Sequence, residues 1–108
     1  MGTREYLGEF EQVALLALVR LDSQAYGMTI RQEIERRTGR SVSIGQLYSA
    51  LNRLESKGFI SSYVADPTPV RGGRAKRYFK AEPQGIDALK RSREILALMW
   101  DGLDPKAV

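Results

Sequence analysis

The side chains best suited to chemistry in this sequence are cations and short polar groups, and they gather in two stretches. Residues 71–80 contain five lysines and arginines and no acid, so this stretch carries a charge of +5. Residues 40–60 carry +2, whereas the rest of the chain sums to −3 and the whole chain to +4. Positive charge concentrated in this way is typical of surfaces that contact nucleic-acid phosphates. A solvated basic loop has the same charge, and charge alone does not separate the two interpretations.

Residue types that are absent from the sequence exclude most catalytic chemistry. The chain has no cysteine and no histidine, which removes thiolate nucleophiles, disulfides, the commonest general base and the commonest transition-metal ligands. An enzyme would need a Ser–Lys or paired-carboxylate site instead, and we interpret Glu55 and Lys57 as the solvated end of a helix. We therefore expect no enzymatic activity, no metal and no cofactor.

The polar residues between Ser43 and Gly58 are predicted to share one face of a helix. Ser43 and Gln46 have the spacing of an N-terminal capping box, and Gly58 ends the pattern. The apolar face comprises Ile44, Leu47, Tyr48, Leu51 and Leu54. The opposite face comprises Gln46, Ser49, Ala50, Arg53 and Lys57. Such an acid-poor polar face suits the DNA major groove, which is wide enough to admit one helix.

The basic stretch adds a second candidate contact with DNA. Residues 66–74 hold two prolines and two glycines, which predicts a loop whose arginines reach a neighbouring minor groove or its phosphates. Tyr48 is better explained as a core residue than as a pure DNA contact. The candidate DNA-binding residues are Ser43, Gln46, Tyr48, Ser49, Asn52, Arg53, Lys57, Arg71, Gly73, Arg74 and Lys76.

The elements that position these residues follow from the spacing of apolar side chains. Helices are predicted at 8–21, where Leu15, Leu16 and Val19 widen the buried stripe, and at 26–38, where Gly39 supplies the end. Strands are predicted at 59–65 and 76–81. Three helices followed by a hairpin predict an α+β, mostly α, winged helix-turn-helix. Residues 1–81 would form this domain.

A last helix is predicted from Pro83 to about Asp101, inside a C-terminal segment, 82–108, that we expect to mediate dimerisation. Its apolar strips exceed what a small three-helix core can cover, and exposed patches of that size mark association sites. The predicted interface residues are Ile86, Leu89, Arg93, Leu96, Trp100 and Leu103. Packing within this interface or against the core is the simplest role for Trp100.

Several of these segments together resemble the PadR-like transcriptional regulators. The resemblance rests on the segment from Phe10 to Leu21, the Ala25-Tyr26-Gly27 step, the run from Leu47 to Gly58, and the hairpin from Gly72 to Phe79, in an order that covers roughly residues 5–100. It implies a bacterial or archaeal homodimer that binds near-palindromic operators in double-stranded DNA, usually as a repressor. It also implies a place for a small hydrophobic effector beside Trp100. The sequence departs from the usual family pattern at Ser49, Phe79 and Glu82.

The remaining expectations concern location and an alternative function. No apolar run approaches the ~20 residues that a membrane span needs. With no signal-like segment at its start, the chain is expected to be a cytoplasmic protein without a membrane partner. The alternative to DNA binding is a winged-helix module that docks an acidic protein with the same surface.

Overall fold

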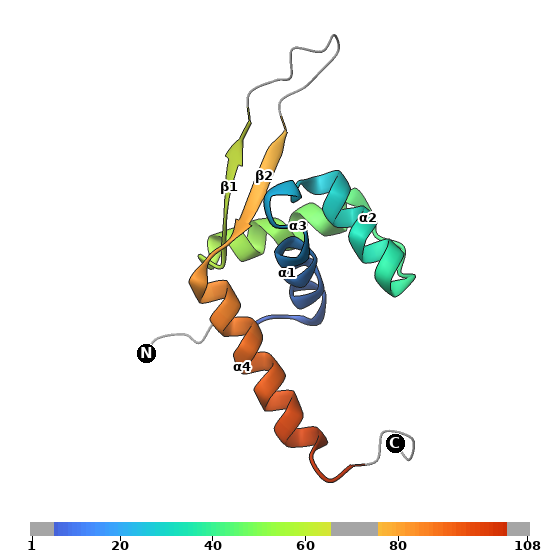
Figure 1. Cartoon of the computed structure of the whole chain (residues 1–108), viewed down its shortest axis with the longest axis vertical. Coiled ribbons are helices and arrows are strands. Elements are labelled where there is room, and N and C mark those ends of the chain that lie inside the picture. The colour runs from blue at the N-terminus through green and yellow to red at the C-terminus, as the bar shows by residue number, and fades with distance from the viewer. Residues whose placement is uncertain (1–5, 66–75, 104–108) are drawn as a thin grey trace.

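The computed structural model describes residues 6–65 and 76–103. In this part the order is α1 (Glu9–Leu21), a short 3-10 turn (Asp22–Gln24), α2 (Gly27–Thr38), α3 (Ile44–Ser56), β1 (Ile60–Val64), β2 (Arg77–Ala81) and α4 (Pro83–Trp100). Figure 1 shows α1, α2 and α3 forming the body, with the hairpin leaving it at one end and α4 at the other. The structure confirms the predicted elements and the mostly helical winged helix-turn-helix.

The core lies among the first three helices and is closed by the hairpin. From α1, Ala14 and Leu15 are fully buried, and the small alanine lets the neighbouring helices pack closely. From the other elements, Ile30, Leu51 and Phe79 are at most 2% exposed. Each fully buried side chain of this size contributes about 1.5–3 kcal/mol of hydrophobic free energy. Packing within this core therefore fixes the position of the hairpin relative to α3.

Two apolar residues of α1 are not part of that core. The prediction that Leu15, Leu16 and Val19 widen the buried stripe holds for Leu15, which is fully buried, and is wrong for Leu16 and Val19, which are 49% and 40% exposed. Both line a groove between α1 and α4. The helical period is correct, but the second apolar strip of α1 faces α4 instead of the core.

The hairpin is tied to the start of α2 as well as to itself. β1 and β2 are antiparallel, with Tyr63 opposite Tyr78. A further bridge joins Tyr26 to Tyr78, and the Phe79 N–H donates to the Ala25 carbonyl at 2.9 Å. The sequence pattern predicts a two-stranded hairpin only, because a bridge of one residue has no periodicity to detect.

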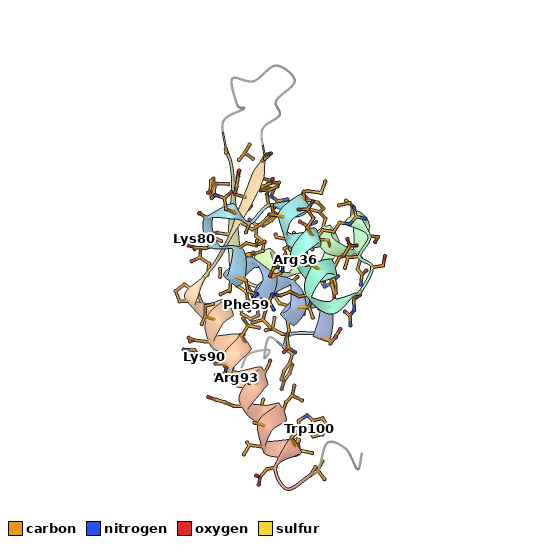
Figure 2. The ribbon with its side chains drawn as sticks, turned by 45° about the vertical axis from the view of Figure 1, so that its right-hand side comes forward. Arg36, Phe59, Lys80, Lys90, Arg93 and Trp100 are labelled. Carbon is orange, nitrogen blue, oxygen red and sulfur yellow. The ribbon has the colours of Figure 1, made fainter. Side chains whose placement is uncertain are left out.

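The last helix begins where the body ends. The Glu82 N–H donates to the Phe59 carbonyl at 2.9 Å, and Pro83 occupies the first turn, where its missing N–H costs nothing. Figure 2 shows Phe59 inside the body and Trp100 near the far end of α4. Only the first turns of α4, through Ala88 and Leu89, pack against the core.

Candidate nucleic-acid interface

The N-terminus of α3 is fixed by its predicted cap. The Ser43 side chain accepts a hydrogen bond from the Gln46 N–H at 3.1 Å, so the structure forms the Ser43 half of the predicted box. Ile44 is 44% exposed, although the spacing places it on the apolar face. Ile44 lies in the first turn of α3, ahead of the first buried residue, Leu47. Its side chain therefore points into solvent although its position along the helix matches the apolar face.

The middle of α3 presents a polar face to solvent. Gln46, Ser49 and Asn52 are exposed, together with the glycine at position 45. Ala50 is fully buried, so its assignment to the polar face is wrong. The solvent-facing strip is therefore narrower than predicted and consists of hydrogen-bonding side chains that suit base edges and phosphates.

The cations of the 40–60 stretch are paired with acids of α1. Arg40 makes two hydrogen bonds to Glu9, at 2.8 and 3.1 Å, which lower the pKa of Glu9. Arg53 and Lys57 share Glu11: the Arg53 Nε lies 3.2 Å from Oε2, and the Lys57 Nζ lies 3.0 Å from both carboxylate oxygens. The +2 of this stretch is therefore offset locally by the acids of the first helix.

The two predicted phosphate contacts at this end differ in how much of each side chain can reach DNA. The Arg53 side chain is 55% exposed, so it can bind Glu11 through Nε and still turn its outer N–H groups to solvent. The Lys57 side chain is only 21% exposed, and its ammonium also donates to the Tyr6 carbonyl at 2.7 Å. Arg53 therefore remains a candidate phosphate contact, whereas Lys57 mainly makes contacts within the protein.

The interpretation of Glu55 and Lys57 as a solvated helix end is wrong. Glu55 accepts a hydrogen bond from Ser62 at 2.8 Å and is also paired with Arg77 of the hairpin. The end of α3 is thus bound to α1 on one side and to the hairpin on the other. These contacts hold the candidate reading helix at a fixed angle to both.

We predict that Glu11→Gln lowers the free energy of unfolding at pH 7 by about 1–3 kcal/mol, because it leaves a half-buried ammonium short of its counter-charge. Burial of Glu11 raises its pKa, but hydrogen bonds from Gly8, Lys57 and Arg53 outweigh burial and lower it overall. A depressed folded-state pKa means that Glu11 stabilises the fold fully above the ordinary carboxyl range of about 4.3 and less as the pH falls through the folded pKa.

Urea unfolding of the wild type and Glu11→Gln from pH 3 to 7 checks this prediction. The difference in the free energy of unfolding between the two proteins should be largest near neutral pH and should shrink in acid. Other carboxylates with lowered pKa values, Glu9 and Glu33, titrate in both proteins and cancel in the difference. A difference that stays constant with pH would contradict the assignment.

Tyr48 lies where α2 and α3 meet, as its interpretation as a core residue predicts. It is half-buried, and its ring centroid lies 6.3 Å from that of Phe79. It also explains Gly27 at the start of α2: a Cβ at that position would overlap the Tyr48 hydroxyl and lie 2.9 Å from Cζ. Tyr48 therefore sets the spacing of the two helices rather than facing DNA directly.

The basic stretch is only partly described. Arg71, Gly73 and Arg74 lie outside the described residues. Lys76 is exposed, and its ammonium lies 4.6 Å from the centroid of the Tyr26 ring. The hairpin thus brings one predicted cation, Lys76, to the end of the body where α2 begins.

The predicted dimer residues lie along α4, except Leu103, which follows the end of the helix. Ile86 and Leu89 are half-buried against the body. The others are exposed, namely Arg93, Leu96, Trp100 and Leu103. Alongside runs a groove of about 550 Å³ between α1 and α4, which Leu16, Val19 and Trp100 line with others. The distal half of α4 is therefore an uncovered apolar surface.

The described part of the chain contains no cluster of metal-ligating side chains and no helix that could span a membrane. Among residues 6–65 and 76–103, no three metal-ligating acidic side chains come together. No helix in the same ranges has the length and apolar character to cross a bilayer.

Known proteins are similar to this chain in sequence and in fold. A family model described as the transcriptional regulator PadR-like family matches residues 15–91. Transcriptional regulator Rv3488 of Mycobacterium tuberculosis is 39% identical over 75 residues, which are 69% of this chain and 65%, slightly under two thirds, of that protein. The solved structure of a transcriptional regulator from Clostridium thermocellum superposes with a TM-score of 0.68 at 31% identity, covering 82% of this chain and 81% of the other. A PadR family regulator from Clostridium difficile has the same TM-score at 23% identity, covering 83% and 90% respectively, and shares the fold.

Proposed function

We propose that this chain, which belongs to the PadR-like family of transcriptional regulators, binds duplex DNA through α3 and the hairpin and represses transcription from a near-palindromic operator. The observation that carries DNA contact is the exposed strip of Gln46, Ser49 and Asn52, which the fold leaves uncovered on α3. No carboxylate occurs between Ser43 and Arg53, so nothing on this strip repels a phosphate. Such a regulator would act in the cytoplasm of a bacterium.

The local geometry explains how α3 would read a sequence. Its first N–H groups and its positive helix dipole end lie beside Ser43, where a phosphate is stabilised. Gln46 and Asn52 carry amides that pair with adenine edges, and the Ser49 hydroxyl donates or accepts. Arg53 would add a phosphate contact from its outer N–H groups. Base reading by neutral side chains thus dominates on α3, and charge enters from the hairpin.

We propose that a second copy of the chain covers the distal half of α4. Leu96, Leu98 and Met99 are 52–76% exposed on this helix, and Leu16 and Val19 extend the apolar surface onto α1. A two-fold dimer through residues 82–108 would present two 1–81 domains with their α3 helices about 34–36 Å apart, one turn of DNA. The +4 charge of each chain would favour such a dimer on DNA.

The groove beside Trp100 is also where a flat hydrophobic effector would bind. Trp100 is 48% exposed, and α1 and α4 supply apolar walls on both sides of the groove. An effector that stacks there would compete with packing between protomers and so change the spacing of the two α3 helices. Packing of the dimer remains the simpler role of Trp100.

Selection of duplexes from a random-sequence pool by the purified protein tests the proposed function. We expect a near-palindrome with half-sites about 10 base pairs apart, centre to centre, and affinity that falls steeply with salt. Gln46→Ala should relax base preference at one position per half-site, with a loss of about 5–150-fold in affinity. Failure to enrich any sequence, together with a protein partner that survives nuclease treatment, would favour the interaction-module alternative.

A further inference from the structure

Three tyrosine rings lie in contact where the hairpin meets α2. The Tyr63 and Tyr78 rings are nearly parallel, with an interplanar angle of 16° and centroids 5.6 Å apart. Tyr26 meets Tyr78 edge-on, with centroids 5.3 Å apart. We call Tyr26, Tyr78 and Tyr63 the tyrosine ladder. Aromatic pairs at such distances contribute free energy beyond the area they bury.

The ladder joins three separate segments of backbone. Tyr63 is in β1, Tyr78 is in β2, and Tyr26 directly precedes α2. On the opposite face of β2, Phe79 is buried and lies against Tyr48 of α3. One face of β2 is thus fixed by the core, and the other is fixed by the ladder. Together they set the angle between the hairpin and the helices.

The ladder lies on the surface, so the burial of apolar area alone does not explain why three tyrosines gather there. Tyr63 is 55% exposed, and Tyr26 and Tyr78 are half-buried. Three neighbouring tyrosines at one end of a small domain form an amphipathic face, apolar in its rings and hydrogen-bonding at its hydroxyls. Such a face suits a position between the protein body and a polar partner.

The two cations at this end of β2 are held in different ways. Arg77 donates from Nε to Ser62 at 3.1 Å and is paired with Glu55, so its charge is already compensated. Lys76 lies over the Tyr26 ring at 4.6 Å and has no carboxylate partner in the described part of the chain. Arg77 also lies over the Phe79 ring at 4.9 Å, but its charge is offset by the Glu55 carboxylate, whereas the ring beneath Lys76 leaves the ammonium charge uncompensated.

We propose that the tyrosine ladder is a positioning platform for DNA binding, which fixes the hairpin against the start of α2 and directs the Lys76 ammonium toward a DNA phosphate. Tyr26, Tyr63 and Tyr78 are positioning residues in this proposal, and Lys76 makes the contact. The inference rests on the proposed function, because it names the partner of Lys76 as the phosphate backbone of the bound duplex.

A double-mutant cycle between Tyr26 and Lys76 tests the platform. The probe is a 30-base-pair duplex recovered by selection with the wild type, and the measurements are affinity at 0.15 M salt and the slope of log K against log salt. We expect Lys76→Met to weaken binding about threefold to tenfold and to reduce the slope by about 1 per protomer. Tyr26→Leu should reproduce both changes, and the double variant should be no weaker than Lys76→Met.

Further variants separate positioning from a general loss of structure. Tyr26→Phe and Tyr78→Phe keep the rings and should bind within about twofold of the wild type, whereas Tyr78→Leu should resemble Tyr26→Leu. Val64→Ala is the matched control, because Val64 is 65% exposed on β1 but is not part of the ladder. It should leave affinity and slope unchanged.

The outcomes distinguish this inference from the proposed function. If the wild type selects no DNA, the proposed function is wrong and the platform falls with it. If the wild type binds DNA but Tyr26→Leu keeps the wild-type slope, or adds its full effect in the Lys76→Met background, the ladder does not position Lys76. A lower melting temperature with an unchanged slope overturns the inference in the same way, because it shows only a structural role.

Discussion

Gly85→Ala should lower the free energy of unfolding by about 1–3 kcal/mol, although alanine is the better helix former. Gly85 is buried in the first turn of α4, and a Cβ there would overlap the Phe59 carbonyl oxygen and lie 3.1 Å from its carbon. Overpacking of this kind costs about 1–3 kcal/mol, and a lost buried hydrogen bond adds about 1 kcal/mol. The gain in helix propensity, at most ~1 kcal/mol, is smaller.

The clash cannot be relieved cheaply because the atoms it meets are backbone atoms held in place. The Phe59 N–H donates to the Leu54 carbonyl at 3.0 Å, and the Phe59 carbonyl accepts from the Glu82 N–H at 2.9 Å. Movement of Phe59 would disturb the end of α3, so α4 must move instead. The substitution therefore loosens the joint between the winged domain and the C-terminal helix.

Chemical denaturation at one fixed protein concentration measures this effect, since association of the chain would shift its apparent stability. Gly45→Ala is the matched control. Gly45 also lies in the first turn of a helix, but a Cβ there has nothing within 4 Å. That variant should be more stable by up to ~1 kcal/mol. Equal responses of the two variants would show that the contact with Phe59 does not limit the joint.

Local signals in the sequence predicted the elements with errors of one or two residues. Ser43 caps α3, Gly39 adopts a left-handed conformation with φ of 73° after α2, and Pro83 opens α4. Each of these residues acts on backbone within four positions of itself, so one sequence contains the information. The distal half of α4 is exposed, as its excess of apolar residues indicates.

The ion pairs of the site could not be predicted in the same way. Lys57 and Glu11 are 46 residues apart, and nothing in the spacing of either shows that α1 and α3 bring them together. The net charge of a stretch therefore overestimates what it offers to DNA, because Arg40, Arg53 and Lys57 all face acids of α1. The polar strip of α3 was predictable from the helical spacing, with the exception of Ala50. A residue as small as alanine fits either the buried or the exposed face of a helix, so its type does not indicate which.

The contacts of the hairpin with α2 show the same limit. Alternation predicts that Tyr63 and Tyr78 lie in strands, but the pairing register and the bridge to Tyr26 depend on how the hairpin packs on the helices. The ladder is thus a consequence of tertiary structure, although its members are visible as tyrosines in the sequence.

Ser49→Glu should weaken DNA binding at least about 100-fold while leaving the fold intact. Ser49 is exposed in the middle of α3, on the strip between Gln46 and Asn52. A helix in the major groove has phosphates on both sides, and a carboxylate placed there faces like charges at a cost of several kcal/mol. In a dimer the substitution acts at both half-sites. Because the side chain is exposed, stability should change by no more than about 0.5 kcal/mol.

Ser49→Gln is the control that isolates charge from size, because glutamine and glutamate differ little in shape. Ser49→Gln removes the hydroxyl and adds the same bulk as Ser49→Glu, so we expect it to lower the affinity for DNA by about tenfold or less. Affinities of the two variants for the selected duplex, measured side by side at several salt concentrations, give the ratio due to charge alone. That ratio should shrink as salt rises, because counterions screen the repulsion. Equal binding by the two variants would place α3 outside the groove and leave the hairpin as the main contact.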